Sequence, residues 1–542
     1  MEKKSGGPIP VIDLFAGPGG LGEGFSRYPL GQKEKVFRIA VSIEKDPHAH
    51  ETLTLRAFFR QFPEGKVPGE YYQYLRSSIT RDKLFEAYPA EADAAKHEAQ
   101  MRTLGNDPEI TKIIGEKIKD HKDWILIGGP PCQAYSLVGR SRMLGLVQAE
   151  GESDRRFALR KRKNEERFEE DHRHTLYKEY LKIIADHSPP VFVMENVKGI
   201  LSAKLNGKRI FPSILEDLKN PVKALGHNKT AVRYQVHSLV APESTMFADS
   251  LEPQDYLIRA EEYGIPQTRH RVILVGIREG YGQGSLLPLK KLKAPSVEQT
   301  IKDLPPLTPG LSREGQGSAI SALEEIRNHP EWSKFLSEPA HAEVALRMDQ
   351  NLEKVRRREQ RGGVFVDNES APEDSWYADS KLKFTINHET RSHIREDLWR
   401  YFFCACFAEE HNRSPVLKDF PKFLQPNHRN VTDAIKGQKF ADRFRVQCWQ
   451  RPATTVTSHI SKDGHYFIHP DTRQYRSLTV REAARLQTFP DNYRFEGPRT
   501  QQFHQVGNAV PPRLAYQIAD RVAHILKSAK PANYVQPLAN HE

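Results

Sequence analysis

The chain has 542 residues, of which 38% are hydrophobic and 28% are charged, a balance typical of globular proteins with two to four domains. No apolar run approaches the ~20 residues that span a membrane, and residues 1–10 lack the apolar core of a signal peptide, so we expect a cytoplasmic protein with no membrane partner. Lys and Arg outnumber Asp and Glu by 81 to 70, which suits a polyanionic partner, although a solubilising surface would explain it equally well.

A glycine-rich turn follows the first predicted strand. Residues 10–25 read PVIDLFAGPGGLGEGF, in which Gly17, Gly19 and Gly22 fit the spacing G-x-G-x-x-G. Such glycines let the backbone approach a ligand, and Glu44, which ends the second predicted strand FRIAVSIE, can accept both hydroxyls of a ribose. The pattern indicates an adenosine-containing cofactor. It does not separate a nicotinamide cofactor from S-adenosylmethionine, and a purely structural turn remains an alternative.

A second turn carries Cys132. The apolar residues DWILI at 123–127 predict a buried strand, and the sequence GGPP then makes a rigid turn before the cysteine. A thiol at the end of a strand is a candidate nucleophile, whereas the alternative is a small buried core residue. The other cysteines are too irregularly spaced for a disulfide framework. We interpret Cys404 and Cys406 as core residues rather than zinc ligands, so no metal site is expected.

Further strands alternate with helices as far as residue 280. Residues 176–200 predict an amphipathic helix followed by a strand that ends in Glu195, and two more strands are predicted at 234–240 and 271–277. The alternation predicts an α/β fold, in which a doubly wound, mostly parallel sheet has helices on both faces. In such a sheet the strand ends that carry the glycine turn, Cys132 and Glu195 lie at one edge.

The remaining segments are more polar. Residues 49–121 are interpreted as mostly helical, and residues 150–170 as part of a charged, solvated helical insertion. The stretch 281–447 is rich in Pro, Gly and charge, which predicts a second, smaller domain after a proline-rich linker. Residues 448–542 return to ordered elements, with two predicted helices.

Six motifs occur in an order that is highly specific: DLFAGPGG, GGPPCQ, ENV, QTRHR, REAARLQTFPD and QVGNAVPP. Together they cover residues 10–280 and 449–525, and the chain resembles the DNA (cytosine-5)-methyltransferases of bacterial restriction-modification systems. The resemblance implies a Rossmann-like, S-adenosylmethionine-dependent catalytic domain formed by residues 1–280 and 448–542. It also implies that residues 281–447 form the target-recognition domain.

The resemblance further implies a chemistry and the residues that perform it. The methyl group would be transferred to C5 of a cytosine flipped out of double-stranded DNA, after Cys132 adds to C6 of the ring. Glu195 would hydrogen-bond N3 and the amino group of the base, and Arg271 would hold its O2. Arg269 would support the site or touch phosphate, and Asn196 would position the turn.

Cofactor and DNA contacts are implied in the same way. The residues assigned to S-adenosylmethionine are Phe15, Ala16, Gly17, Gly20, Glu44, Pro130, Asn508 and Val510. The acidic residue that normally approaches the adenine amino group is not evident, and Ser78 is the candidate for its place. The residues assigned to DNA are Gln133, Ser136, Arg140 and Thr455. The segments 387–401 and 454–466 are candidate DNA-facing pieces, although His388, Arg391 and His393 would serve equally well to cap and solvate a helix.

Several alternatives remain beside this reading. The transfer RNA methyltransferases of the same family carry Cys-Phe-Thr in the variable region, and here Cys406-Phe407-Ala408 departs from that pattern. A catalytically inactive DNA-binding relative would not need Cys132, Glu195 and Arg271 together. A nicotinamide oxidoreductase would have no use for the PPCQ and ENV motifs. The expected partners are double-stranded DNA and a cognate restriction endonuclease that acts independently, and we expect a monomer.

Overall fold

The computed structural model describes residues 7–105, 107–131, 153–154, 156–157, 173–205, 208–226, 232–241, 251–281, 286–312, 317–355, 357–370, 372–426 and 442–528. Four predicted site residues lie outside the described residues, namely Cys132, Gln133, Ser136 and Arg140. Most of the predicted charged helix at 150–170 also lies outside them. Within the described part of the chain, no helix combines the length and apolarity that crossing a membrane requires.

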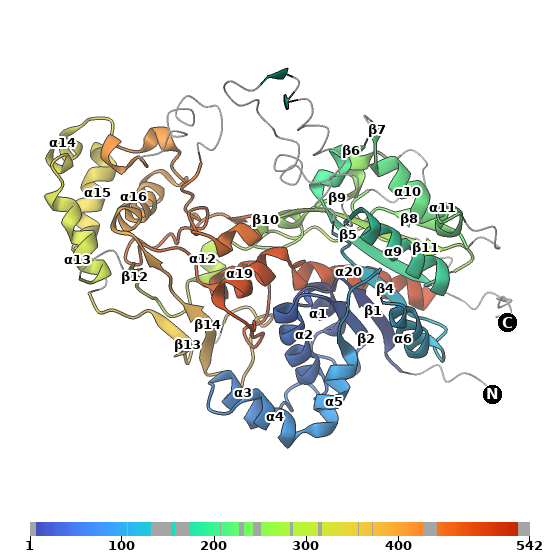
Figure 1. Ribbon diagram of the computed structural model, residues 1–542. Coiled ribbons are helices and arrows are strands. Elements are labelled where there is room, and N and C mark those ends of the chain that lie inside the picture. The colour runs from blue at the N-terminus through green and yellow to red at the C-terminus, as the bar shows by residue number, and fades with distance from the viewer. Residues whose placement is uncertain are drawn as a thin grey trace.

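An eight-stranded sheet forms the centre of the right-hand half of the molecule in Figure 1. Its order is β3-β2-β1-β4-β5-β11-β8, with β9 also paired to β11. The strands are β1 (Ile9–Leu14), β2 (Phe37–Glu44), β3 (Ala99–Met101), β4 (Ile125–Gly128), β5 (Val191–Val197), β8 (Tyr234–His237), β9 (Leu257–Arg259) and β11 (His270–Arg278). The first five pair in parallel, whereas β11 runs antiparallel to β5, β8 and β9. The predicted doubly wound, mostly parallel sheet is therefore confirmed.

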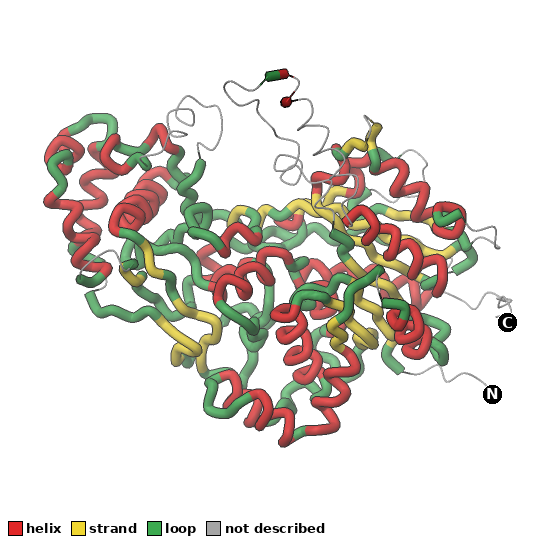
Figure 2. Tube along the Cα trace, viewed as in Figure 1, coloured by secondary structure: helices red, strands yellow, loops and turns green. Residues whose placement is uncertain are grey.

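Both faces of the sheet are buried because successive residues point to opposite sides. Val11 and Ile127 belong to one apolar cluster, whereas Ile12 and Leu126 belong to another. The helices that cover the first face are α1 (Gly20–Ser26) and α20 (Pro512–Ser528), and those that cover the second are α6 (Glu109–Ile118), α9 (Arg173–His187) and α10 (Phe211–Lys219). Figure 2 shows the resulting helix–sheet–helix layers.

The first and last helices pack backbone to backbone. A Cβ atom added at Gly24 of α1 would lie 2.4 Å from the Cβ atom of Ala515 and 2.4 Å from the Pro512 carbonyl oxygen of α20. Only glycine leaves room for so close a contact. The C-terminal helix α20 thus completes the layer over the first strands.

We expect Gly24→Ala to lower the free energy of unfolding by about 3 kcal/mol, because the added methyl group meets backbone atoms that cannot move independently. Denaturant unfolding of the full chain would measure the loss. Gly69→Ala is the matched control, since a Cβ atom there meets nothing within 4 Å. Equal stability of the two variants would contradict the packing described for α1 and α20.

A separate apolar cluster forms the helical lobe at the left of Figure 1. Its helices are α13 (Ala319–Glu324), α14 (Trp332–Ser337), α15 (Ala342–Leu352) and α16 (Arg395–His411). Cys404 and Cys406 of α16 are fully buried in this cluster, which confirms them as core residues. Burial raises the pKa of the Cys404 thiol well above its usual value, as is typical of an inert core cysteine.

One piece of the middle segment, residues 376–386, packs on helices and loops beside the central sheet instead of on the helical lobe. Trp376 donates from Nε1 to the Thr488 carbonyl at 2.8 Å, and the Arg27 guanidinium lies 4.3 Å from its ring centre. Tyr72 donates to Asp379 at 2.8 Å. Phe384 and Ile386 share a cluster with the helices that follow β2. The domain boundaries at residues 280 and 447 stay a prediction. The contacts described here show that the middle segment packs on the part of the molecule that contains the sheet as well as forming the helical lobe.

The other elements connect these two parts. The remaining helices are α2 (Pro47–Arg60), α3 (Gly69–Leu75), α4 (Arg81–Ala87), α5 (Pro89–Glu98), α11 (Pro221–Ala224), α12 (Val297–Ile301), α18 (Val480–Leu486) and α19 (Arg499–Asn508). The short strands are β6 (Lys204–Leu205), β7 (Lys208–Arg209), β10 (Gln267–Thr268), β12 (Gly310–Leu311), β13 (Gly362–Asp367), β14 (Phe384–Glu389), β15 (Ser392–His393) and β16 (Ala453–Thr454). Figure 1 shows α12 and α19 between the sheet and the helical lobe.

Candidate active site

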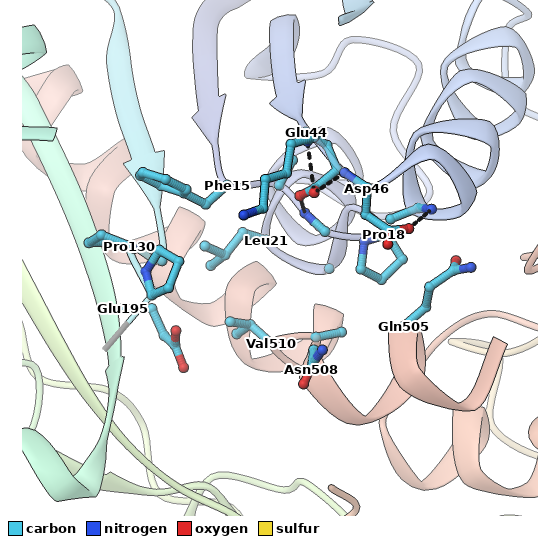
Figure 3. Close-up of a pocket in the computed structure, with 18 of the residues that line it drawn as sticks. Phe15, Pro18, Leu21, Glu44, Asp46, Pro130, Glu195, Gln505, Asn508 and Val510 are labelled. Atoms are coloured by element: carbon cyan, nitrogen blue, oxygen red, sulfur yellow. Dashed lines mark hydrogen bonds between the residues drawn. The ribbon is translucent and has the colours of Figure 1, made fainter. Parts of the chain in front are cut away.

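A cavity of about 400 Å³ opens at one edge of the sheet. Its walls come from the turns that follow β1 to β4, from the end of β5, from the start of the reversed strand β11 and from α19. The predicted residues that line it are Phe15, Ala16, Gly17, Gly20, Glu44, Pro130, Glu195, Asn196, Arg271, Asn508 and Val510. Segments far apart in the sequence therefore meet at the edge where α/β proteins bind their ligands (Figure 3).

The glycine-rich turn after β1 is held in an unusual backbone conformation. Phe15 and Gly17 both have φ of 56°, in the left-handed region that favours glycine. A Cβ atom on Gly17 would meet nothing within 4 Å, so this residue faces open space. The Gly17 N–H donates to Glu44 Oε2 at 2.8 Å. A hydrogen bond thus joins the glycine-rich turn to the acidic residue at the end of β2.

Backbone groups also fix the Glu44 carboxylate from the other side. The N–H groups of Lys45 and Asp46 both donate to Oε1 at 2.8 Å. These bonds pre-orient the carboxylate, which still lines the cavity (Figure 3). A carboxylate oxygen has capacity for more than one donor, so Glu44 can accept further hydrogen bonds from a ligand.

Glu195 and Arg271 form an ion pair on the wall of the same cavity. The Arg271 Nε atom lies 2.8 Å from Glu195 Oε1, and both side chains are 14% exposed. The register of β5 against β11 pairs Glu195 with Ile273, which places Arg271 two residues along the same face. Burial lowers the pKa of Arg271, and the Glu195 carboxylate opposes this effect. A negative and a positive group are therefore held together at the cavity wall.

The turn after β4 is positioned by Asn196. Its Nδ2 atom donates to the Pro130 carbonyl at 3.2 Å, while its Oδ1 atom accepts from the Val197 N–H at 2.9 Å. A Cβ atom at Gly129 would lie 2.8 Å from Glu195 Oε2. Pro131, which also lines the cavity, directly precedes Cys132 in the sequence.

Arg269 lies beneath the site instead of in it. It is fully buried, and its guanidinium donates to the carbonyls of Val456 at 2.7 Å, Gly507 at 3.1 Å and Ala509 at 2.8 Å. A side chain with this packing supports the surrounding segments and has no surface for a phosphate. Of the two roles expected from the sequence, the supporting one fits this position.

Several residues that line the cavity were not predicted from the sequence. Among them are Leu21, Arg102, Thr103, Leu104, Leu176, Gln501, His504 and Gln505. Arg102 to Leu104 follow β3, a strand of three residues in a region that we interpreted as helical. Ser78, the sequence candidate for the adenine end, is exposed between α3 and α4 and is not part of the cavity lining. At this end of the sheet β3, not the α3–α4 turn, reaches the cavity.

The named side chains of the first DNA-facing candidate, residues 387–401, are mostly buried. His388 has no exposed surface, Arg391 is 9% exposed and His393 is 6% exposed. Arg391 donates to the carbonyls of Ile460 and Lys462 and lies 4.0 Å from the ring centre of Phe503. These residues hold segments together and have little surface left for another partner. In the second candidate segment, Thr455 is partly exposed and donates to the Thr268 carbonyl, so its contact with DNA stays a prediction.

His388 belongs to a buried polar cluster around α18. Its Nε2 atom faces the Pro305 carbonyl at 2.7 Å and its Nδ1 atom faces the Thr479 hydroxyl at 2.9 Å. A carbonyl only accepts, so Nε2 carries the proton and Nδ1 accepts from the hydroxyl. Burial lowers the pKa of both His388 and His469 to about 4. Both histidines are thus neutral in the folded protein.

This cluster predicts a loss of stability in mild acid. The pKa of each histidine is lower in the folded state than the usual value of about 6.5, so protons bind preferentially to the unfolded chain. The contribution of these histidines to the free energy of unfolding is fully present above about pH 6.5. By pH 4 we expect the free energy of unfolding to fall by on the order of 3 kcal/mol per histidine. Denaturant unfolding as a function of pH would measure the slope.

The comparison of variants isolates the histidine from other titrating groups. His388→Asn should flatten the acid slope relative to the wild-type protein, whereas His97→Asn should leave it unchanged, because His97 is 65% exposed. Burial raises the pKa of Asp13 to about 8, so Asp13 makes the free energy of unfolding change with pH in the opposite direction. Its effect is the same in the wild type and both variants, and it cancels when their curves are subtracted. Parallel curves for the wild type and His388→Asn would refute the assignment.

The sequence profile described as C-5 cytosine-specific DNA methylase matches residues 96–524. The chain belongs to this family. It is 32% identical over 539 residues to the type II methyltransferase M.Bpa9945I of Bacillus paralicheniformis, covering 95% of this chain and 99% of that protein. It is 25% identical to M.AgeI of Thalassovita gelatinovora, covering 95% and 99%, and 26% identical to M.DdeI of Desulfomicrobium norvegicum, covering 95% and 88%. The chain is thus a DNA (cytosine-5)-methyltransferase, which uses a methyl donor and acts on DNA.

Proposed function

We propose that the methyl donor is S-adenosylmethionine, bound in the cavity at the edge of the sheet. Three observations support this fit: the cavity volume of about 400 Å³, the pre-oriented Glu44 carboxylate and the open space in front of Gly17. When bound, this cofactor supplies an electrophilic methyl group. Glu44 accepts the ribose hydroxyls, and Asn508 and Val510 contact the cofactor from the opposite wall (Figure 3).

We propose that Cys132, Glu195 and Arg271 act on the cytosine. The ion pair that lines the cavity carries this proposal, because it places a carboxylate and a guanidinium beside the turn that precedes Cys132. The Cys132 thiolate adds to C6, which makes C5 nucleophilic. Glu195 holds N3 and the amino group, and Arg271 orients Glu195 and holds O2. After methyl transfer, loss of the C5 proton allows Cys132 to leave. Arg269 acts as a positioning residue.

We also propose the cellular setting of this reaction. The target is a specific sequence in double-stranded DNA, read by side chains of residues 281–447 together with Gln133, Ser136, Arg140 and Thr455. The similarity to type II methyltransferases supports a role in a restriction-modification system, in which a cognate endonuclease acts independently. The enzyme acts as a monomer in the cytoplasm.

Transfer of a labelled methyl group tests the proposal. The full chain is incubated with labelled S-adenosylmethionine and either duplex DNA of mixed sequence or transfer RNA. The expected result is label in DNA alone, recovered as 5-methylcytosine after digestion to nucleosides. Label in RNA alone would move the substrate assignment to the transfer RNA branch, and label in another nucleoside would overturn the assignment of C5.

Gly129→Ala should lower methyl transfer about tenfold to a hundredfold with little change in stability. The new Cβ atom would lie 2.8 Å from Glu195 Oε2, so the carboxylate must move from its place beside Arg271. Initial rates at saturating substrates would measure the loss, and thermal unfolding would check the fold. In the control Gly115→Ala, the added atom has only an ordinary contact at 3.8 Å. Full activity of Gly129→Ala would show that the observed Glu195 position is not the reactive one.

A further inference from the structure

Arg102 follows strand β3 and lines the end of the cavity that lies beside this strand. The register of β3 against β2 pairs Met101 with Glu44, so Arg102 follows directly after the partner of the proposed ribose ligand. The Arg102 N–H donates to the Glu44 carbonyl at 3.1 Å. This bond joins the two turns, and Arg102 lines the cavity beside Glu44.

The Arg102 guanidinium is anchored by neighbours on its own segment. One terminal nitrogen donates to Asp107 Oδ2 at 2.5 Å, and Nε donates to Gln100 Oε1 at 3.4 Å. The side chain is 30% exposed, and its hydrogen bond lowers the pKa of Asp107. A guanidinium with two nitrogens engaged in this way loses much of its rotational freedom. It therefore presents a flat face of constant orientation.

The residues around Arg102 suit an uncharged flat ring. Ile43, Leu104 and Leu176 line the cavity and pack in the same apolar cluster as Phe15. Leu104, two residues after Arg102, is only 6% exposed. A heteroaromatic ring in this part of the cavity is buried by aliphatic groups and lies within reach of a planar cation. Arginine stacks favourably on such rings.

We propose that Arg102, held by Asp107, stacks on the adenine ring of the bound cofactor. This inference rests on the proposed function and names the residue that recognises the adenine end in this chain. In this proposal the Arg102 guanidinium contacts the face of the adenine ring, not its edge. Arg102 is accordingly a cofactor-binding residue, and Asp107 is a positioning residue that acts through it.

Binding of two ligands of different length tests the proposal. Dissociation constants for S-adenosylhomocysteine and for adenosine are measured with the full chain, since adenosine shares only the adenine and ribose. Arg102→Met should weaken both ligands by the same factor, about fivefold to tenfold. Arg102→Lys keeps the positive charge but lacks the planar guanidinium, so its affinity for both ligands should be nearly as low as that of Arg102→Met. Asp107→Asn should weaken the binding of both ligands by about twofold to threefold. The guanidinium is still present in this variant, but a neutral amide holds it less firmly than the carboxylate does.

The control is Arg38→Met, because Arg38 is an exposed arginine on β2 that does not line the cavity. Its dissociation constants should match those of the wild type. Unchanged binding by the Arg102 variants, with a wild type that binds both ligands, would overturn this inference and leave the proposed cofactor intact. A loss confined to S-adenosylhomocysteine would also overturn it, since Arg102 would then serve the amino-acid end.

Two further outcomes keep the inference separate from the proposed function. A wild-type protein that binds neither ligand would refute S-adenosylmethionine as the donor. If Arg102→Met does not fold, Arg102→Lys and Asp107→Asn provide the same readout. Equal affinities of these two variants and the wild type would then overturn the stacking assignment.

Discussion

Cys132→Ser should reduce methyl transfer to DNA by at least about a thousandfold. A serine hydroxyl is a far weaker nucleophile than a thiolate, and without addition at C6 the C5 carbon of cytosine does not attack a methyl group. Binding of S-adenosylhomocysteine should stay within about twofold of the wild type, because the proposed contacts of Glu44, Asn508 and Val510 are retained. Labelled methyl transfer and equilibrium binding on the same preparations would measure both effects.

A trapping experiment sharpens this prediction. Duplex DNA with fluorine at C5 of its cytosines offers no proton for the final elimination, so the wild-type enzyme should stay covalently attached after methyl transfer. Cys132→Ser should leave no such complex. Cys448→Ser is the matched control, because Cys448 is a partly buried cysteine outside the cavity lining, and it should react like the wild type. A covalent complex with Cys132→Ser would transfer the nucleophile's role to another residue.

Glu195→Gln should lower the rate constant of methyl transfer by about a hundredfold to a thousandfold. The amide has nearly the same size, but it cannot hold N3 and the amino group of the base as a carboxyl group does. It also leaves Arg271, whose Nε atom lies 2.8 Å from Glu195 Oε1, beside a neutral partner. Single-turnover kinetics with saturating DNA would measure the chemical step apart from binding.

The expected signature is a fall in rate with little change in cofactor affinity, because the contact that we propose for Glu195 is with the base. Glu261→Gln is the control: Glu261 pairs with His270 of the same strand as Arg271 at 2.8 Å but does not line the cavity. It should keep the wild-type rate. A Glu195→Gln variant with more than about a tenth of the wild-type rate would limit Glu195 to a structural partner of Arg271.

The sequence motifs predicted which segments would meet at the cavity. Glycine-rich and proline-rich turns mark where strands end, and parallel strands bring those ends to one edge. Phe15, Glu44, Pro130 and Glu195 lie together for this reason. The reversed strand β11 brings Arg271 to the same edge from its start rather than its end.

Residues outside the strong motifs could not be predicted in this way. Strand β3 has only three residues, too few to show an alternating pattern, and its region was interpreted as helical. Arg102 and Leu104 were therefore missed. The sequence left Arg269 between supporting the site and touching phosphate, and His388 between facing DNA and capping a helix. Their burial depends on acceptors such as the Val456 and Pro305 carbonyls, which are distant in the sequence.

The contact between α1 and α20 has a consequence for how the enzyme is made. During translation the Gly17 turn and Glu44 leave the ribosome before β11, whereas α19 and α20 follow only after the middle segment. At about 5–20 residues per second, the ~250 residues between β11 and the end of α20 take roughly 10–50 s to synthesise. During that interval the nascent protein has most of its sheet but lacks one wall of the cavity. We therefore expect a chain that stops before α19 to bind S-adenosylmethionine poorly, because the wall that carries the proposed contacts of Asn508 and Val510 is missing.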